Sequence, residues 1–247
     1  MGRLMRMLVT RPEPDAQGTC ERLAALDIAA EIAPLMTRQT LPAHLPPPEG
    51  FAAIALTSSN ALRALNDLGA TAGIQDKPVF AVGDRTAHEA RQLGFSQVSA
   101  ADGTLESLAT TIALARLDGP VFYPAGKHLS GDLAHALAPH GLMVVTVPVY
   151  EMVAETSLPP QIAGQLTTGS FDAVLFYSRR TAEIFCTLAA PVTAEAVRRQ
   201  LPVICLSENV ATPLIEKHFS RVLLADHPSE EAMMSIALAF AREQTGS

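Results

Sequence analysis

The most informative segment of the sequence is Leu56-Thr57-Ser58-Ser59-Asn60-Ala61-Leu62, because a similar segment occurs later as Phe176-Tyr177-Ser178-Arg179-Arg180-Thr181-Ala182. In each segment, an apolar run typical of a strand ends at a hydroxyl side chain and opens directly into an amphipathic helical pattern. Short strands that alternate with helices are typical of a parallel sheet covered by helices on both faces. The repeat therefore predicts two related α/β units.

Other blocks of sequence repeat around this pair and place the two units along the chain. Three blocks of the middle third are matched, in the same order, by blocks of the C-terminal third (56–62 with 176–182, 79–95 with 203–219, 100–106 with 224–230). The first copy continues into residues 121–150, whereas the second copy ends. Its missing piece lies at the N-terminus, where residues 7–36 match 121–150 at a constant offset of 114. The N-terminal segment is thus expected to fold with the C-terminal third.

The expected fold class is α/β, with two similar doubly wound, flavodoxin-like parallel-sheet lobes joined by a two-stranded linker. The first lobe is discontinuous (residues 1–37 and 168–247), and the second lobe (51–148) is inserted into it. The linkers are expected at 38–50 and 149–167, because both carry prolines, which disfavour helices and remove backbone donors. General likeness among doubly wound folds is the alternative explanation of the repeat.

The apolar pattern also predicts individual elements. Strands are expected at short apolar runs (7–10, 54–57, 79–82, 98–100, 121–123, 144–147, 174–176, 203–206, 222–224). Helices are expected where apolar residues recur every three or four positions (19–26, 60–68, 86–93, 105–115, 129–138, 181–188, 210–218, 229–242). Ligands are expected in a cleft between the lobes, at the carboxyl ends of the strands.

Composition limits the classes of function. With 18 basic and 25 acidic residues the net charge is −7, which argues against nucleic acid as a partner. Three scattered cysteines (Cys20, Cys186, Cys205) predict neither a disulfide framework nor a zinc site. No targeting segment is recognised at the start of the chain and no apolar run is long enough to cross a membrane, so a cytoplasmic protein is expected. Glycine-rich nucleotide motifs and metal-ligand spacings are missing, so no cofactor and no metal are expected.

Strand-to-helix turns with small or hydroxyl residues are the remaining candidates for a site. Helix N-termini present unpaired N–H groups and a positive dipole end, which favour anions. Several such turns with nearby cations predict a small ligand that carries carboxylates or phosphates (candidate residues Arg11, Ser59, Gly83, Gly126, Lys127 and Ser207). Ordinary helix capping is the alternative role for each hydroxyl.

An ordered set of motifs resembles the uroporphyrinogen-III synthase family. The motifs are Leu8-Val9-Thr10-Arg11-Pro12, Leu56-Thr57-Ser58-Ser59-Asn60-Ala61, Phe80-Ala81-Val82-Gly83-Asp84-Arg85-Thr86-Ala87, Tyr123-Pro124-Ala125-Gly126, Val147-Pro148-Val149-Tyr150, Leu175-Phe176-Tyr177-Ser178 and Pro228-Ser229-Glu230-Glu231-Ala232. The resemblance covers nearly the whole chain. It implies a lyase of haem biosynthesis that needs no cofactor and closes the linear tetrapyrrole hydroxymethylbilane, with loss of water and inversion of the last ring, into uroporphyrinogen III.

The resemblance also implies roles for individual residues. Tyr150 matches the family's tyrosine and is the candidate that assists departure of the hydroxyl group; packing of its ring at a strand end is the alternative. Ser58, Thr86 and Ser178 match ligand-contacting positions. Two positions depart from the pattern of some members, because Ser207-Glu208-Asn209-Val210 replaces Gly-Pro-x-Thr and Asn60 replaces an arginine. These departures favour a site dominated by backbone groups.

Two other functions stay open at this point. The chain could be a non-catalytic two-lobed binder of a polyanionic small molecule, or a two-lobed transferase that uses a nucleotide donor. The lack of an export signal disfavours the first alternative, and the lack of a phosphate-binding glycine motif disfavours the second. The expected partner is a linear tetrapyrrole polycarboxylate, and a monomer is expected.

Overall fold

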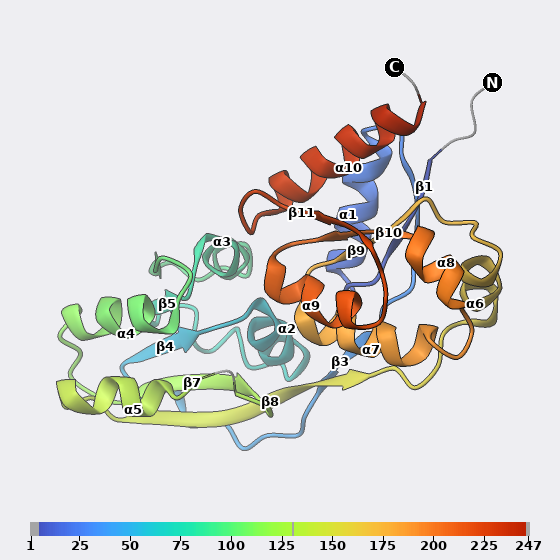
Figure 1. Cartoon of the computed structure of the whole chain (residues 1–247). Coiled ribbons are helices and arrows are strands. Elements are labelled where there is room, and N and C mark those ends of the chain that lie inside the picture. Colours follow the sequence, from blue (N-terminus) through green and yellow to red (C-terminus); the bar gives the residue numbers. More distant parts are fainter. Residues whose placement is uncertain (1–4, 130, 246–247) are drawn as a thin grey trace. The chain divides into compact units, whose positions relative to one another are not determined.

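The computed structural model describes residues 5–129 and 131–245 of the chain (Figure 1). The chain divides into two compact units. Unit 1 comprises the chain up to Thr37 and from Val153 onward, and unit 2 comprises Arg38–Met152. Each unit has its own sheet and its own apolar core on both faces of that sheet.

Unit 1 contains a parallel sheet in the order β2-β1-β9-β10-β11. Its strands are β1 (Arg6–Val9), β2 (Ala29–Ile32), β9 (Ala173–Phe176), β10 (Pro202–Cys205) and β11 (Arg221–Leu224). Its helices are α1 (Asp15–Ala24), α6 (Pro160–Thr167), α7 (Arg179–Ala189), α8 (Glu195–Gln200), α9 (Glu208–Glu216) and α10 (Glu230–Thr245). Because successive strand residues point to opposite faces, Val174 and Phe176 pack with α6, α7 and α9, whereas Ala173 and Leu175 pack with α1 and α10.

Unit 2 contains a sheet in the order β3-β8-β7-β4-β5-β6. Its strands are β4 (Ala53–Leu56), β5 (Val79–Ala81), β6 (Val98–Ala100), β7 (Val121–Gly126) and β8 (Val144–Ala154), with β3 (Met36–Thr40) at the edge. Its helices are α2 (Ser59–Asp67), α3 (Asp84–Gln92), α4 (Leu105–Leu114) and α5 (Leu133–Leu137), with short 3₁₀ turns η1 (Pro48–Gly50) and η2 (Ala138–His140). Ile54 and Leu56 pack with α2 and α3, whereas Ala53 and Ala55 pack with α4 and α5.

The two sheets share one spatial plan, although the chain runs through them in different orders. The order of neighbouring strands across the sheet is β8-β7-β4-β5-β6 in unit 2 and, at corresponding positions, β2-β1-β9-β10-β11 in unit 1. In unit 2, β4 pairs with β5 and β7, β5 pairs with β6, and β7 pairs with β8, each time in parallel. The strand order therefore matches the repeat that the sequence predicted, and the α/β class with parallel sheets is confirmed.

Several elements differ from the sequence-based expectation. The stretch 149–167, expected as a linker, contains the end of β8 and helix α6, whose Ile162 and Leu166 are buried in the core of unit 1. Pro160 stands in the first turn of α6, where its missing N–H costs nothing. Ala43 and Leu45 of the expected linker 38–50 pack against the core of unit 2. Strand β3 and helix α8 were not expected.

The helix expected at 129–138 is shorter in the structure. Helix α5 begins at Leu133 because the Asp132 carboxylate accepts a hydrogen bond from the His135 N–H at 2.9 Å and caps the helix. The described residues do not include 1–4, 246–247 or Ser130. The ends of the expected first lobe and one residue of this expected helix fall on them. Across the part of the chain that the structure describes, none of the helices has both the length and the apolar character to cross a membrane.

Candidate functional site

The carboxyl ends of parallel strands lie at one edge of a sheet, and doubly wound folds bind ligands at this edge. The preferred position is the point where successive connections leave for opposite faces of the sheet. In unit 2 this point lies between β4, which leads into α2 on one face, and β7, which leads into α5 on the other. In unit 1 it lies between β9, which leads into α7, and β1, which leads into α1. We call these the switch points of the two units.

Ser58 and Ser178 begin the first helix after the central strand of each unit. The Ser58 hydroxyl accepts a hydrogen bond from the Asn60 N–H, and the Ser178 hydroxyl accepts one from the Thr181 N–H, both at 3.2 Å. Both hydroxyls thus act as helix caps, which is the alternative role that the sequence left open. The Ser58 oxygen keeps further hydrogen-bonding capacity, so capping and ligand contact are compatible there. The Ser178 hydroxyl also shares a hydrogen bond of 2.7 Å with the Thr181 hydroxyl, so its proton is left for a ligand only when Thr181 donates.

Helices α3 and α9 begin without a side-chain cap. Gly83 has no side chain to offer, and Ser207, with extended backbone, makes no capping hydrogen bond. Because the first N–H groups of a helix have no partner within the helix, these two turns can donate to an anion. The two turns follow β5 and β10, which hold corresponding places in the two sheets.

Ser59 and Thr86 lie in the first turns of α2 and α3. Their exposed fractions are only 7% and 6%, so their hydroxyls offer little surface to a ligand. In these turns, the backbone N–H groups are therefore better candidates for binding a ligand than the hydroxyls of Ser59 and Thr86.

Tyr150, within β8, lies beside Gly126, the last residue of β7. A β-bulge pairs Gly126 with Tyr150 after pairing Ala125 with Pro148, and the Lys127 N–H donates to the Tyr150 carbonyl at 2.8 Å. A Cβ atom added at Gly126 would lie 3.0 Å from Cζ and 3.1 Å from the hydroxyl oxygen of Tyr150. Glycine at this position thus leaves room for the phenol to rest against the backbone.

Lys127 extends from the turn after β7, and its charge is paired. Its ammonium group donates to Glu151 at 2.9 Å, and the His128 ring lies 3.4 Å from the other oxygen of the same carboxylate. The hydrogen bond from Lys127 lowers the pKa of Glu151. Lys127 also borders a shallow, mostly apolar hollow of about 480 Å³ that is lined by Leu41, Pro42, Ala43, His44, Val147 and Pro148.

Tyr123 and Thr57 join the two strands at the switch point of unit 2, and the sequence did not single them out. Their hydroxyl oxygens are 2.9 Å apart, and Tyr123 is 4% exposed. Burial raises the pKa of Tyr123. The sequence offered one indication of this pair, because Tyr123 carries a hydroxyl within the strand expected at 121–123. Its apolar neighbours, however, made it resemble an ordinary core residue.

Arg11 is bound within unit 1. Its guanidinium donates to Glu230 at 2.6 Å and to Thr19 at 3.0 Å, and it lies 4.1 Å from the centre of the Tyr177 ring. The Tyr177 hydroxyl donates to Glu230 at 3.0 Å, and burial raises the pKa of Tyr177 far above its usual value. Because this network balances the charge of Arg11, the structure favours a structural role for it over ligand binding.

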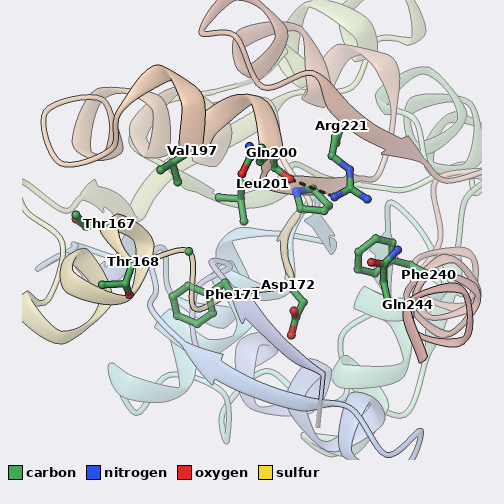
Figure 2. A pocket seen from close by; sticks show the side chains of 12 residues that line it. Thr167, Thr168, Phe171, Asp172, Val197, Gln200, Leu201, Arg221, Phe240 and Gln244 are labelled. Atoms are coloured by element: carbon green, nitrogen blue, oxygen red, sulfur yellow. Dashed lines mark hydrogen bonds between the residues drawn. The ribbon is translucent and has the colours of Figure 1, made fainter. Parts of the chain in front are cut away.

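A cavity of about 400 Å³ lies at the opposite, amino-terminal edge of the sheet in unit 1 (Figure 2). Asp172 and Arg221 line it, and Arg221 donates to the Gln200 carbonyl at 3.3 Å. The C-terminal ends of α6 and α8 also lie here, and such ends disfavour anions. The helix C-termini and the Asp172 carboxylate make this cavity unsuited to a polycarboxylate, and none of the predicted site residues borders it.

A metal site is not found in residues 5–129 and 131–245, where no three His, Cys, Asp or Glu side chains are placed to share an ion. At its own carboxyl edge, unit 2 carries the uncapped N-terminus of α3, the Ser58 hydroxyl and the phenol of Tyr150, and unit 1 carries the uncapped N-terminus of α9 and the Ser178 hydroxyl. These groups can bind carboxylates and donate hydrogen bonds to a reacting substrate.

Comparisons with known proteins concern the fold and the family of the chain. The crystal structure of uroporphyrinogen-III synthetase from Helicobacter pylori 26695 is similar in fold, with a TM-score of 0.67 and 20% identity over 96% of this chain and 99% of that chain. A mutant uroporphyrinogen III synthase from the extremely thermophilic bacterium Thermus thermophilus is also similar, with a TM-score of 0.53 and 17% identity over 98% of this chain and 100% of that chain. The comparison with curated proteins finds no match. Because the family model for uroporphyrinogen-III synthase HemD matches residues 20–235, the chain belongs to the uroporphyrinogen-III synthase family.

Proposed function

We propose that turns at the carboxyl edges of both sheets bind the carboxylate arms of the substrate, and that Tyr150 assists the chemical step. The reaction is that of the family, in which hydroxymethylbilane loses water and closes as uroporphyrinogen III. Family membership supports this lyase activity and not the alternative of a non-catalytic binder. The uncapped N-termini of α3 and α9, at corresponding places in the two units, are the observation that carries the binding proposal.

Backbone N–H groups suit this substrate because its acetate and propionate arms are spread around a flexible chain. Gly83 and Ser207 are proposed to present such groups, with Ser58, Ser178 and Lys127 as supporting contacts. Ser59, Thr86 and Gly126 are proposed to shape the turns, because the first two are nearly buried and the third has no side chain. Arg11, paired with Glu230, is not part of this proposal.

The binding proposal is tested by giving an uncapped helix a carboxylate of its own. In Ser207→Asp the new carboxylate would accept hydrogen bonds from N–H groups in the first turn of α9 and repel a substrate carboxylate, so KM should rise about threefold to tenfold. Ala194→Asp is the matched control, because α8 also begins without a side-chain cap but follows α7 rather than a strand. An unchanged KM in Ser207→Asp, in protein that melts no lower than wild type, would refute binding at this turn.

Tyr150 is proposed to donate a hydrogen bond to the hydroxyl group that leaves the substrate. Leaving hydroxide needs a proton, and a positioned side-chain donor typically contributes about 100-fold to 10⁴-fold in rate. The contact of its phenol with Gly126 supports the proposal, since the backbone limits where the hydroxyl can lie. Tyr150→Phe should lower kcat with little change in KM. The assay supplies enzymatically generated hydroxymethylbilane and separates the oxidised porphyrin isomers by chromatography.

The finer architecture is proposed as two doubly wound lobes, the first discontinuous, joined by a linker of two strands. β3 and β8 support this proposal, because they are neighbours in one sheet and the division between the units falls within both. We also propose that the protein acts as a monomer in the cytoplasm. Light scattering coupled to size-exclusion chromatography tests the monomer, and cell fractionation tests the location.

A further inference from the structure

Two hydroxyl groups connect the strands at the switch point of unit 2. Thr57 directly follows β4, Tyr123 lies in β7, and their oxygens share a hydrogen bond of 2.9 Å. Tyr123 is 4% exposed, whereas Thr57 is only partly buried. The pair therefore has one member enclosed in the core and one at the edge where ligands bind in doubly wound folds.

Either hydroxyl of this pair can donate, and the burial of Tyr123 favours the phenol as the donor. Desolvation is the largest cause that raises the pKa of Tyr123, and proximity to Tyr150 raises it further, so Tyr123 keeps its proton at neutral pH. A buried phenol needs an acceptor, and Thr57 supplies one. When the threonine oxygen accepts from Tyr123, its own proton is left for another acceptor. A hydroxyl that accepts one hydrogen bond also becomes a better donor in the next.

The corresponding switch point of unit 1 is arranged differently. Tyr177 takes the place of Thr57 in the sequence repeat, and its hydroxyl donates to Glu230 rather than to the neighbouring strand. The Arg11 guanidinium covers the Tyr177 ring and pairs with the same carboxylate. Unit 1 therefore uses its hydroxyl and its cation internally, whereas unit 2 keeps a hydroxyl proton available.

We propose that Thr57 binds one carboxylate arm of the tetrapyrrole and determines which product isomer forms, and that Tyr123 is a positioning residue that acts through Thr57. The inference rests on the proposed function in one respect: the carboxyl edge of unit 2 must bind the substrate. An arm held at Thr57, on the same sheet edge as Tyr150, orients the terminal ring before closure. Without this contact more substrate closes directly, which gives the type I isomer.

Four variants test the inference. Thr57→Val and Tyr123→Phe each remove one hydroxyl with little change in volume, and each should raise KM about threefold to tenfold and increase the fraction of type I product. Thr57→Ser keeps the hydroxyl and should stay near wild type. The double variant should be no worse than Thr57→Val alone, because Tyr123 acts through Thr57.

Tyr177→Phe is the matched control, because it removes a partly buried tyrosine hydroxyl at the corresponding switch point of unit 1. It should lower the melting temperature and leave the isomer ratio unchanged, which separates loss of stability from loss of positioning. Additive effects in the double variant, or a wild-type KM and isomer ratio in Tyr123→Phe, would overturn the inference. Should Tyr123→Phe not fold, the comparison of Thr57→Val with Thr57→Ser decides: equal isomer ratios refute a role for the hydroxyl.

The same measurements separate this inference from the proposed function. An elevated KM in Ser207→Asp together with wild-type behaviour in Thr57→Val refutes the role of Thr57 and leaves carboxyl-edge binding in place. A wild-type KM in both variants refutes the binding proposal itself.

Discussion

The contact between Gly126 and Tyr150 allows the phenol to be displaced without mutating it. In Gly126→Ala the added Cβ would lie 3.0 Å from Cζ, 3.1 Å from the hydroxyl oxygen and 3.3 Å from Cε2 of Tyr150. Carbon atoms pack comfortably at about 3.5–4.0 Å, so the ring end must move by roughly 0.5–1 Å. Because the obstacle is the far end of a side chain, the ring can move while the fold is retained.

A displacement of about 1 Å at a reacting group can cost about 100-fold in rate. We therefore expect Gly126→Ala to lower kcat about tenfold to 100-fold, with overpacking destabilising the protein by about 1–3 kcal/mol. The rate of uroporphyrinogen III formation gives kcat, and urea unfolding followed by circular dichroism gives the stability. Gly164→Ala is the matched control, because a Cβ there meets nothing within 4 Å, so activity should be unchanged.

The double variant Gly126→Ala/Tyr150→Phe sharpens the test. If the alanine acts by displacing the phenol, it should have little further effect on kcat once the hydroxyl is gone. A wild-type kcat in Gly126→Ala would contradict the proposed role of the phenol, as would a full additional loss of kcat when the alanine is added to Tyr150→Phe.

Three further predictions concern stability and reactivity. Arg11→Met leaves the Glu230 carboxylate without its closest partner, so it should destabilise the protein by about 3 kcal/mol in urea unfolding while KM changes little; a large rise in KM with unchanged stability would contradict this. Hydrogen bonds from Thr40 and Arg38 lower the pKa of Asp67 from its usual 3.8. The ionised carboxylate therefore stabilises the folded state above pH 3.8, and this stabilisation is lost as the pH falls through the lowered pKa of the folded state. Asp67→Asn should therefore lose less stability than wild type on acidification below about pH 4, and parallel pH profiles would argue against it. Cys20, which is partly exposed, should react slowly with a thiol reagent in the native protein, whereas burial raises the pKa of the other two cysteines to about 11 and about 12. Those two should react only after unfolding, and prompt labelling of all three thiols would contradict the described core.

Some of the site could be predicted from sequence because capping and strand ends follow local rules. Ser58 and Ser178 follow apolar strands and precede helical patterns, and both turned out to begin helices. Gly83 and Ser207 begin helices at the equivalent positions of the repeat. Such positions are local in sequence, so a pattern of a few residues is enough to place them.

Helix α6 shows where local patterns misled. Prolines 159 and 160 suggested a linker, yet at the start of a helix a proline costs no hydrogen bond, and burial of Ile162 and Leu166 supports the helix. Strand β3 was missed for a related reason. Its residues Met36–Thr40 are mostly polar, and pairing with β8 stabilises them rather than burial of an apolar face.

Local patterns in the sequence predicted the α/β class and the correspondence between the two sets of strands, because alternating apolar runs specify strands buried between helices and the repeat pairs them. The same patterns also placed the turns at which we propose that the substrate binds. The order of the strands in each sheet came from the structure. Which polar groups are already engaged became clear from the folded arrangement. Arg11 meets Glu230 across 219 residues of sequence, and Tyr123 meets Thr57 across 66. Hydrogen bonds and ion pairs depend on distances in space, and no local pattern carries the distance between residues so far apart in the chain.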